Sequence, residues 1–226
     1  MITMKGRLGR CWLFTFRAPE AEARAILPRP LVPVTREGQA FWNAVVCRME
    51  SMRPRGLPGF LGMGYWHVAY RLHVRHREEE GLYFVRSDCD SGLMAWMGNL
   101  MTDFRFHAGA VEVQEDRDWL RIGVDVPGGK AEATLRRGTA RLPKHSIFGS
   151  LDEAAAFLKY KPRGFSVGSD GQVRVVRIVR DESAWRARPV EIVSQEWAFF
   201  KGMGVTPEIC TEVDPIAYQW NRSEPC

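Results

Sequence analysis

Lysine is scarce in this chain of 226 residues, although lysine and arginine together number 32. The lysines are Lys5, Lys130, Lys144, Lys159, Lys161 and Lys201, and every other cation is arginine. The cations are spread among 27 acidic residues, and no block of five or six like charges occurs. The formal charge of +5 therefore gives only a generic attraction to polyanions, and a nucleic-acid partner is not expected.

Cysteine is also sparse, and no Cys-x-x-Cys pair occurs among Cys11, Cys47, Cys89, Cys210 and Cys226. Their odd number and their spacing indicate neither a disulfide framework nor a zinc knuckle. No hydrophobic run approaches the roughly 20 residues of a membrane span. The first residues lack the apolar core and the small-residue cleavage site of a signal peptide. We therefore expect a soluble, reduced, cytoplasmic protein without a membrane partner.

Several catalytic and cofactor signatures are missing as well. The glycines between Gly59 and Gly64 lead into a predicted strand, so they lack the helix N-terminus that makes such a loop bind phosphate. No Gly-x-Ser-x-Gly motif marks a nucleophilic serine. The histidines have no spacing typical of a metal site. The sequence thus indicates no nucleotide, no other cofactor and no metal.

Alternation of polarity dominates the stretch from Gly64 to Ser91. One face of its first predicted strand is apolar and consists of Trp66, Val68, Tyr70, Leu72 and Val74. The other face carries titratable groups, namely Tyr65, His67, Arg71 and His73. Three glutamates followed by Gly81 predict a tight turn, and residues 82–89 predict the partner strand. One face should belong to the core, and the other could line a site.

The remaining pattern predicts short strands joined by turns. We expect strands over 11–16, 31–35, 40–52, 102–113, 119–126, 131–137, 172–180 and 190–200, and a loop over 53–62. Helices are expected over 20–27, over 154–160, and from a cap at Asp90 or Ser91 to Met101. The methionine-rich stripe of that last helix favours core packing, with a ligand-facing role as the alternative. After Gly202 no period is readable.

No linker divides the chain, so we expect one domain over residues 1–226. Many short strands with a few short helices favour a mainly β fold, either an antiparallel barrel or a wrapped sandwich. Closure of such a sheet removes the exposed edges that would otherwise pair with other chains.

Several stretches, taken in order, resemble one known family. They are Ile26-Leu27-Pro28-Arg29-Pro30-Leu31, Arg53-Pro54-Arg55-Gly56-Leu57-Pro58, the segment 82–91, Phe104-Arg105-Phe106-His107-Ala108, and the segment 151–160 followed by 185–190. Together they are similar to the YqjF-like group of uncharacterised bacterial proteins, the DUF2071 domain, over roughly residues 10 to 200. That group is placed with the acetoacetate decarboxylase-like fold. The resemblance implies an antiparallel β-barrel with a closed, ligand-sized interior.

The resemblance does not imply the mechanism of acetoacetate decarboxylase. In that enzyme a lysine amine, kept neutral by a neighbouring cation, attacks a carbonyl and forms a Schiff base. This chain has no lysine between Arg86 and Gly129, and Phe106-His107 stands where the reactive pair would fall. A lysine mechanism would require Lys130 or Lys144 to reach the interior.

Six residues are the candidates for an interior site. A buried arginine can bind a carboxylate with two hydrogen bonds, and a histidine can carry a proton near neutral pH. We predict catalytic roles for His107 and Asp88, and ligand-binding roles for Arg71, Arg55, His73 and Tyr65. Arg71, Asp88 and His107 also match the family pattern.

Each candidate has a structural alternative. Arg71 could be solvated or paired with Asp88 across the hairpin. His67 and His73 could lie on the surface, and His107 could be a buried, hydrogen-bonded core residue.

Two functions remain open from the sequence. The first is a barrel that binds a small carboxylate or apolar metabolite in its interior. The second is an enzyme acting on a small carbonyl or carboxylate substrate, as a decarboxylase-like lyase or a hydrolase without a lysine mechanism. In that case Arg71 would anchor the substrate and His107 would carry the proton. A homo-oligomer is left open.

Overall fold

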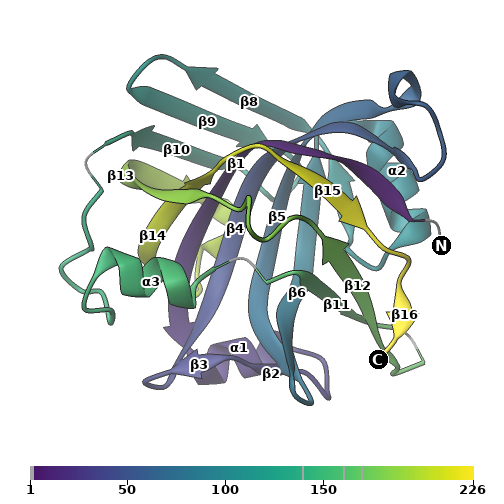
Figure 1. Ribbon diagram of the computed structural model, residues 1–226. Helices are drawn as coiled ribbons and strands as arrows, with labels where there is room; N and C mark the ends of the chain where they lie inside the picture. The colour runs from purple at the N-terminus through teal and green to yellow at the C-terminus, as the bar shows by residue number, and fades with distance from the viewer. Residues whose placement is uncertain (1–2, 139, 160, 169) are drawn as a thin grey trace.

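The computed structural model describes residues 3–138, 140–159, 161–168 and 170–226. The fold is mainly β, with helices only at its margins (Figure 1). Its centre is a wall of four strands: β1 (Met4–Pro19), β4 (Gln39–Pro54), β5 (Met63–His76) and β6 (Glu79–Cys89). β1 pairs with β4, β4 with β5 and β5 with β6, all antiparallel. Both faces of this wall are buried, and each faces a separate interior.

The first interior lies inside a closed ring of strands. From β6 the hydrogen-bonded path continues through β11 (Arg163–Val167), β12 (Val173–Val179) and β15 (Ile216–Trp220), and β15 returns to β1. Because β1 also pairs with β4, the path closes on itself. We call this the first ring and its inside the lumen. Lumen-facing side chains include the aliphatic residues Leu8, Leu13, Val45, Ala69, Val176 and Ile178.

The second interior lies on the opposite face of the wall. From β1 the sheet continues through β14 (Thr206–Val213), β13 (Ala187–Trp197), β10 (Ala131–Arg136), β9 (Trp119–Asp125) and β8 (Ala110–Glu115). β8 follows directly on β7 (Phe106–Ala108), which pairs with β6 and so brings the chain back to the wall. Large aromatic side chains fill this second interior, including Trp12, Phe14, Phe16, Trp42, Tyr70 and Trp197.

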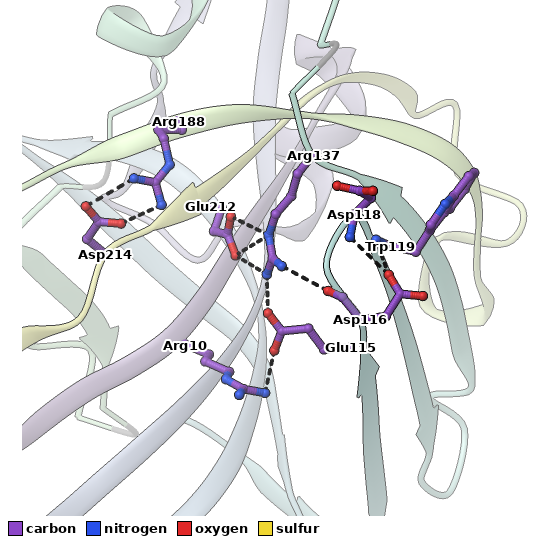
Figure 2. A network of polar contacts seen from close by, with 9 residues as sticks. All are labelled: Arg10, Glu115, Asp116, Asp118, Trp119, Arg137, Arg188, Glu212 and Asp214. Carbon is purple, nitrogen blue, oxygen red and sulfur yellow. Dashed lines mark hydrogen bonds and ion pairs between the residues drawn. The ribbon is translucent and has the colours of Figure 1, made fainter.

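Ion pairs link strands of the second sheet that do not share a ladder. Figure 2 shows Arg137, just after β10, between Glu212 of β14 and Glu115 of β8. Its Nη2 lies 2.8 Å from Glu212 Oε1. Arg10 of β1 contacts the same Glu115, with Nη1 2.6 Å from Oε2. These carboxylates raise the pKa of Arg137, with the Glu212 hydrogen bond as the largest contribution. The four side chains thus tie the curled edge strand β8 to β1 and β14.

Short elements complete the fold. The helices are α1 (Glu20–Ile26), α2 (Gly92–Met101) and α3 (Leu151–Phe157), with 3-10 turns η1 (Gly59–Leu61) and η2 (Ala198–Phe200) and the short strands β2 (Val32–Pro33), β3 (Thr35–Arg36) and β16 (Glu224–Pro225). The side chain of Ser91 caps α2, and that of Ser150 caps α3 through the Glu153 N–H at 3.1 Å. No helix in the described part of the chain is long and apolar enough to cross a membrane.

The structure confirms the mainly β architecture, the hairpin of β5 and β6, the three helices and the loop after Pro54. Tyr160, which the predicted third helix includes, lies outside the described residues. The predicted strand over 102–113 is wrong, because α2 runs to Met101 and two strands, β7 and β8, follow. β11 and the strands β14 to β16 were not predicted from the sequence. β14 shows no alternation because Glu208, Ile209, Cys210 and Thr211 are all buried.

The turn between β5 and β6 also differs from its prediction. Arg77 and Glu78 form it, with φ 52° at Arg77, while Glu79 and Glu80 already belong to β6. Gly81 sits within that strand for a different reason. A Cβ atom there would lie 2.6 Å from Cε2 of Phe165, so glycine allows β11 to approach closely.

Candidate functional site

The alternating face of β5 predicted to carry titratable groups points into the lumen. All four residues are buried there, namely Tyr65, His67, Arg71 and His73. At most 2% of the surface of each residue is exposed to solvent. The opposite, apolar face packs into the second interior. The predicted sidedness of this strand is therefore correct, but both faces are enclosed. The alternative that these histidines lie on the surface is wrong.

Arg71 is held in the middle of the lumen by a neighbouring strand. It lies directly opposite Asn43 of β4, and its Nη2 donates a hydrogen bond to Asn43 Oδ1. The Nδ2 of Asn43 donates in turn to the backbone oxygen of Phe14, at 3.4 Å. The guanidinium carbon lies 5.5 Å from the ring centre of Phe84, which faces it from β6. This arrangement fixes the cation without placing it on the surface.

A row of sulfur and imidazole groups crosses the same face of the wall. Cys11 pairs with Cys47, Cys47 with His67 and His67 with Cys89, across β1, β4, β5 and β6. A hydrogen bond from Cys11 lowers the pKa of Cys47, and His67 and the charge of Arg71 lower it further against the effect of burial. Burial raises the pKa of Cys11. Cys47 is therefore the thiol of this row that ionises first.

Arg71 and three members of this row line one small cavity of about 20 Å³. Its wall contains Arg71, His67, Cys47 and Cys11, together with Trp185 and Trp220. The Nε2 atom of His67 and the Nε1 atom of Trp220 are buried and have no hydrogen-bond partner in the described part of the chain. The two indoles are the half-buried members of the lining, so they separate the cavity from solvent. A volume of this size holds about one water molecule or one small polar group.

His73 lies one step further along the same face. It is 1% exposed, and its buried Nδ1 has no hydrogen-bond partner within residues 3–138, 140–159, 161–168 and 170–226. Burial, and then the charges of Lys161 and Arg71, lower its pKa from 6.5 to about 3. The ring is therefore neutral at physiological pH and does not provide a second cation beside Arg71.

Asp88 and His107 lie on the other face of the wall. Asp88 pairs with Val68 of β5 and with His107 of β7, whereas Arg71 pairs with Phe84. The Nδ1 atom of His107 lies 3.5 Å from Oδ1 of Asp88, and Nε of Arg86 lies 2.8 Å from the same oxygen. Burial raises the pKa of Asp88. The side chain of His107 is 45% exposed, so it is not a core residue.

The single interior site expected from the sequence is thus divided in two. Arg71, His73 and Tyr65 share the lumen, while Asp88 and His107 meet at the margin of the second interior. The expected alternative of an ion pair between Arg71 and Asp88 is also wrong, because the sheet separates them. Arg55 is in neither place and lies exposed in the turn after β4.

No lysine occupies the lumen. All six lysines lie in the described part of the chain, and none of them is buried. Lys130 forms an exposed ion pair with Asp125, and Lys144 is exposed. Lys161, which acts on the charge state of His73, pairs with Glu80 at 3.0 Å. Neither lysine that the Schiff-base mechanism would need reaches the interior.

A second cavity adjoins the first. It has a volume of about 40 Å³ and lies between α2 and the lumen face, where Tyr65 helps to line it. Five of its lining residues are methionines, namely Met4, Met52, Met94, Met97 and Met101. We call it the methionine cavity. The stripe predicted along α2 therefore divides, because its methionines face inward while Leu93, Trp96 and Leu100 are exposed.

His67, Asn43, Cys11 and Cys47 are not among the six site residues predicted from the sequence. His67 carried a signal, since it alternates with Arg71 on the polar face. The other three had none, because their approach depends on the register of strands far apart in the sequence. Among the described residues no cluster of three or more His, Cys, Asp or Glu side chains could hold a metal ion.

Comparison with known proteins identifies the family. The family model of DUF2071, described as an uncharacterized conserved protein, matches residues 7–221. The chain belongs to the DUF2071 family. A search among curated proteins finds no match.

Solved structures similar to this DUF2071 protein share its fold. An acetoacetate decarboxylase-like enzyme from Sphingomonas wittichii RW1 has a TM-score of 0.67 and 12% identity, covering 99% of this chain and 92% of its own. Acetoacetate decarboxylase from Legionella pneumophila has a TM-score of 0.67 and 14% identity, covering 100% and 87%. The enduracididine biosynthesis enzyme MppR, complexed with pyruvate, has a TM-score of 0.63 and 11% identity, covering 100% and 90%. The expected acetoacetate decarboxylase-like fold is thus confirmed.

Proposed function

We propose that this DUF2071 protein binds a small carboxylate in the lumen, with Arg71 as its anchor. The observation that carries the proposal is the composition of one cavity wall. A buried guanidinium lines it together with two side chains, His67 and Trp220, whose buried ring nitrogens have no hydrogen-bond partner among the described residues. Buried polar atoms of this kind are costly unless something pairs with them. An anion that accepts several hydrogen bonds satisfies them together.

The electrostatics of the lumen favour an anion of small size. Arg71 is fixed by Asn43 and Phe84, so little side-chain freedom is lost when it binds a carboxylate. His73 is neutral and does not add a competing charge. MppR, which has this fold at 11% identity, has been solved with pyruvate, a small carboxylate. That complex supports the choice of ligand class for this chain.

Calorimetric titration with propanoate, against propanamide as the uncharged match, tests the anchor. We expect propanoate to bind and propanamide not to bind. Arg71→Gln should weaken propanoate binding at least about tenfold, because a charge-assisted hydrogen bond contributes roughly 1.5–3 kcal/mol. Arg55→Gln, which removes an exposed arginine, is the matched control and should leave the affinity for propanoate unchanged.

A second substitution separates loss of binding from loss of fold. Asn43→Asp keeps the size of the side chain and places a carboxylate against Arg71. It should abolish propanoate binding while the variant still unfolds cooperatively in urea. Equal binding of acid and amide, or equal losses in Arg55→Gln and Arg71→Gln, would refute the proposal.

The contact between Asp88 and His107 supports a second candidate function, proton transfer on a small carbonyl substrate. A carboxylate 3.5 Å from the Nδ1 of a half-exposed imidazole, which also contacts the backbone oxygen of Ser87, is an arrangement that suits a general base. Arg71 cannot anchor that substrate, because it lies on the other face of the wall. Exchange of the α-protons of 2-keto acids in D₂O, followed by NMR, measures this activity. It should require His107, and exchange that persists in His107→Gln would contradict it.

A further inference from the structure

The methionine cavity and the cavity beside Arg71 have one lining residue in common, Trp220. Its indole lies edge-on to His67, with ring centres 6.2 Å apart, and also packs near Tyr218 and Phe104. Trp220 ends β15 opposite Met4 of β1, and its side chain is half-buried. The indole is therefore a partition between the two cavities, and its rotation would join them.

The two cavities follow each other along β5. His67 lines the polar cavity and Tyr65 the methionine cavity, and both side chains point to the lumen. Two residues of a strand span about 7 Å, so the cavities are immediate neighbours, and the side chain of Arg71 itself lines the polar one. The joined space has a cation at one end and methionine side chains at the other.

Methionine makes the apolar end adaptable. Its unbranched side chain has three rotatable bonds and a polarizable sulfur, and it repacks around ligands of different shape. Met97 and Met101 of α2 are half-buried, so they can move outward without displacing the wall of strands. The cavities have volumes of about 40 Å³ and about 20 Å³, so a ligand longer than a few atoms requires these side chains to move.

We infer that the ligand is an aliphatic carboxylic acid of medium chain length, whose carboxylate binds Arg71 and whose tail occupies the methionine cavity. This inference rests on the proposed carboxylate site and adds the apolar half of the ligand. The indole of Trp220 turns aside as the tail passes it. The head group satisfies the buried nitrogens beside Arg71, and the tail replaces the contacts that the methionine side chains make with one another.

A series of unbranched acids tests the inference by calorimetry, using propanoate, hexanoate, octanoate and dodecanoate. Each methylene buried should tighten binding about fourfold. Octanoate should then bind more than a hundredfold tighter than propanoate, and the gain should end once the tail exceeds the cavity. 1-Octanol has a comparable tail without the carboxylate, and it should bind far more weakly than octanoate.

Two variants on α2 provide the matched pair. Met97→Gln places a polar group of similar length against the tail, and it should weaken octanoate at least tenfold while leaving propanoate unchanged. Leu100→Gln alters a residue that is 72% exposed on the outer side of the same helix, and it should leave both acids unchanged.

The possible failures are distinguishable. If propanoate binds through Arg71 but affinity does not grow with chain length, the present inference is wrong and the carboxylate site stands. If octanol and octanoate bind equally and Arg71→Gln does not change the affinity for octanoate, both the present inference and the proposed carboxylate site are wrong. If Leu100→Gln removes octanoate binding as Met97→Gln does, the acid adsorbs to the outer surface and the inference is overturned.

Discussion

The two interiors of this protein share one wall but differ in what fills them. On one face of β5, Val68, Tyr70 and Leu72 pack among tryptophan and phenylalanine rings of the second interior. On the other face, His67, Arg71 and His73 project into a lumen whose far end is lined by flexible methionines. The cavity beside Arg71 lies on the lumen side of this strand, whereas buried polar atoms without a hydrogen-bond partner among the described residues occur on both faces, at His67 and His73 and at Tyr70 and His76. The comparison suggests that one side maintains the fold, which leaves the other side free to hold chemical groups.

The largest contrast should be in stability. Trp42 is 1% exposed and packs edge-on against Phe199 and Phe200, with ring centres 5.6 and 5.5 Å away. Trp42→Ala should lower the free energy of unfolding by about 3–5 kcal/mol, because it leaves a large cavity among rigid neighbours. Met97→Ala, beside the existing methionine cavity, should cost less than half as much. Urea unfolding measures both, and equal losses would mean that the two interiors are packed alike.

A smaller effect should appear in the pH dependence of stability. The pKa of His73 is about 3 in the folded protein and near 6.5 in the unfolded chain. Between these values the unfolded chain binds a proton that the folded protein does not, so stability falls as the pH drops below 6.5. His73→Gln should remove up to about 1.4 kcal/mol per pH unit from that slope.

Urea unfolding at pH 7, 6 and 5 measures the slope for the wild type and the variant. His145→Gln is the control, because His145 is exposed. If His73→Gln and the wild type show the same slope, the imidazole of His73 takes up its proton inside the lumen, and the lumen is more polar than its burial indicates.

The smallest effect should separate two buried thiols. Cys47 faces the lumen, where its neighbours lower its pKa, whereas burial in the second interior raises the pKa of Cys210. Iodoacetate at pH 7 should therefore label Cys47 about tenfold faster than Cys210 in the native protein. Peptide mass spectrometry measures both rates. Propanoate should slow labelling of Cys47, and equal rates at the two thiols would indicate that labelling follows unfolding.

Period-two alternation was sufficient to predict the sidedness of β5, because Trp66 to Val74 are uniformly apolar at every second position. The family pattern and the chemistry of the side chains also grouped Asp88 and His107 with Arg71, and the structure separates them. Between Tyr70 and Arg71 the register with β6 shifts by one residue, so Tyr70 lies opposite Arg86 while Arg71 lies opposite Phe84. This bulge moves residues 86–89 of β6 to the opposite faces from those that strict alternation predicts. The sequence of residues 82–89 gives no sign of the bulge.

The row of sulfur and imidazole groups in the lumen could not be predicted for a related reason. Cys11, Cys47 and His67 come from three strands, and only their pairing brings them together. Hydrophobic patterning predicts which face of a strand is buried, but it does not predict the register between strands. The turn chemistry was more informative, since Ser91 and Ser150 cap their helices as their spacing indicates.

Even-numbered and odd-numbered positions along β5 have different roles, because even-numbered side chains pack in the second interior and odd-numbered ones face the lumen. Positions 66, 68, 70, 72 and 74 can keep the scaffold intact while substitutions at 65, 67, 71 and 73 change what the lumen recognises. A single inserted residue, in contrast, would exchange the two sets and bring the guanidinium among the tryptophans. New specificities on this scaffold should therefore arise by replacement at odd-numbered positions, and length changes should be confined to the loops.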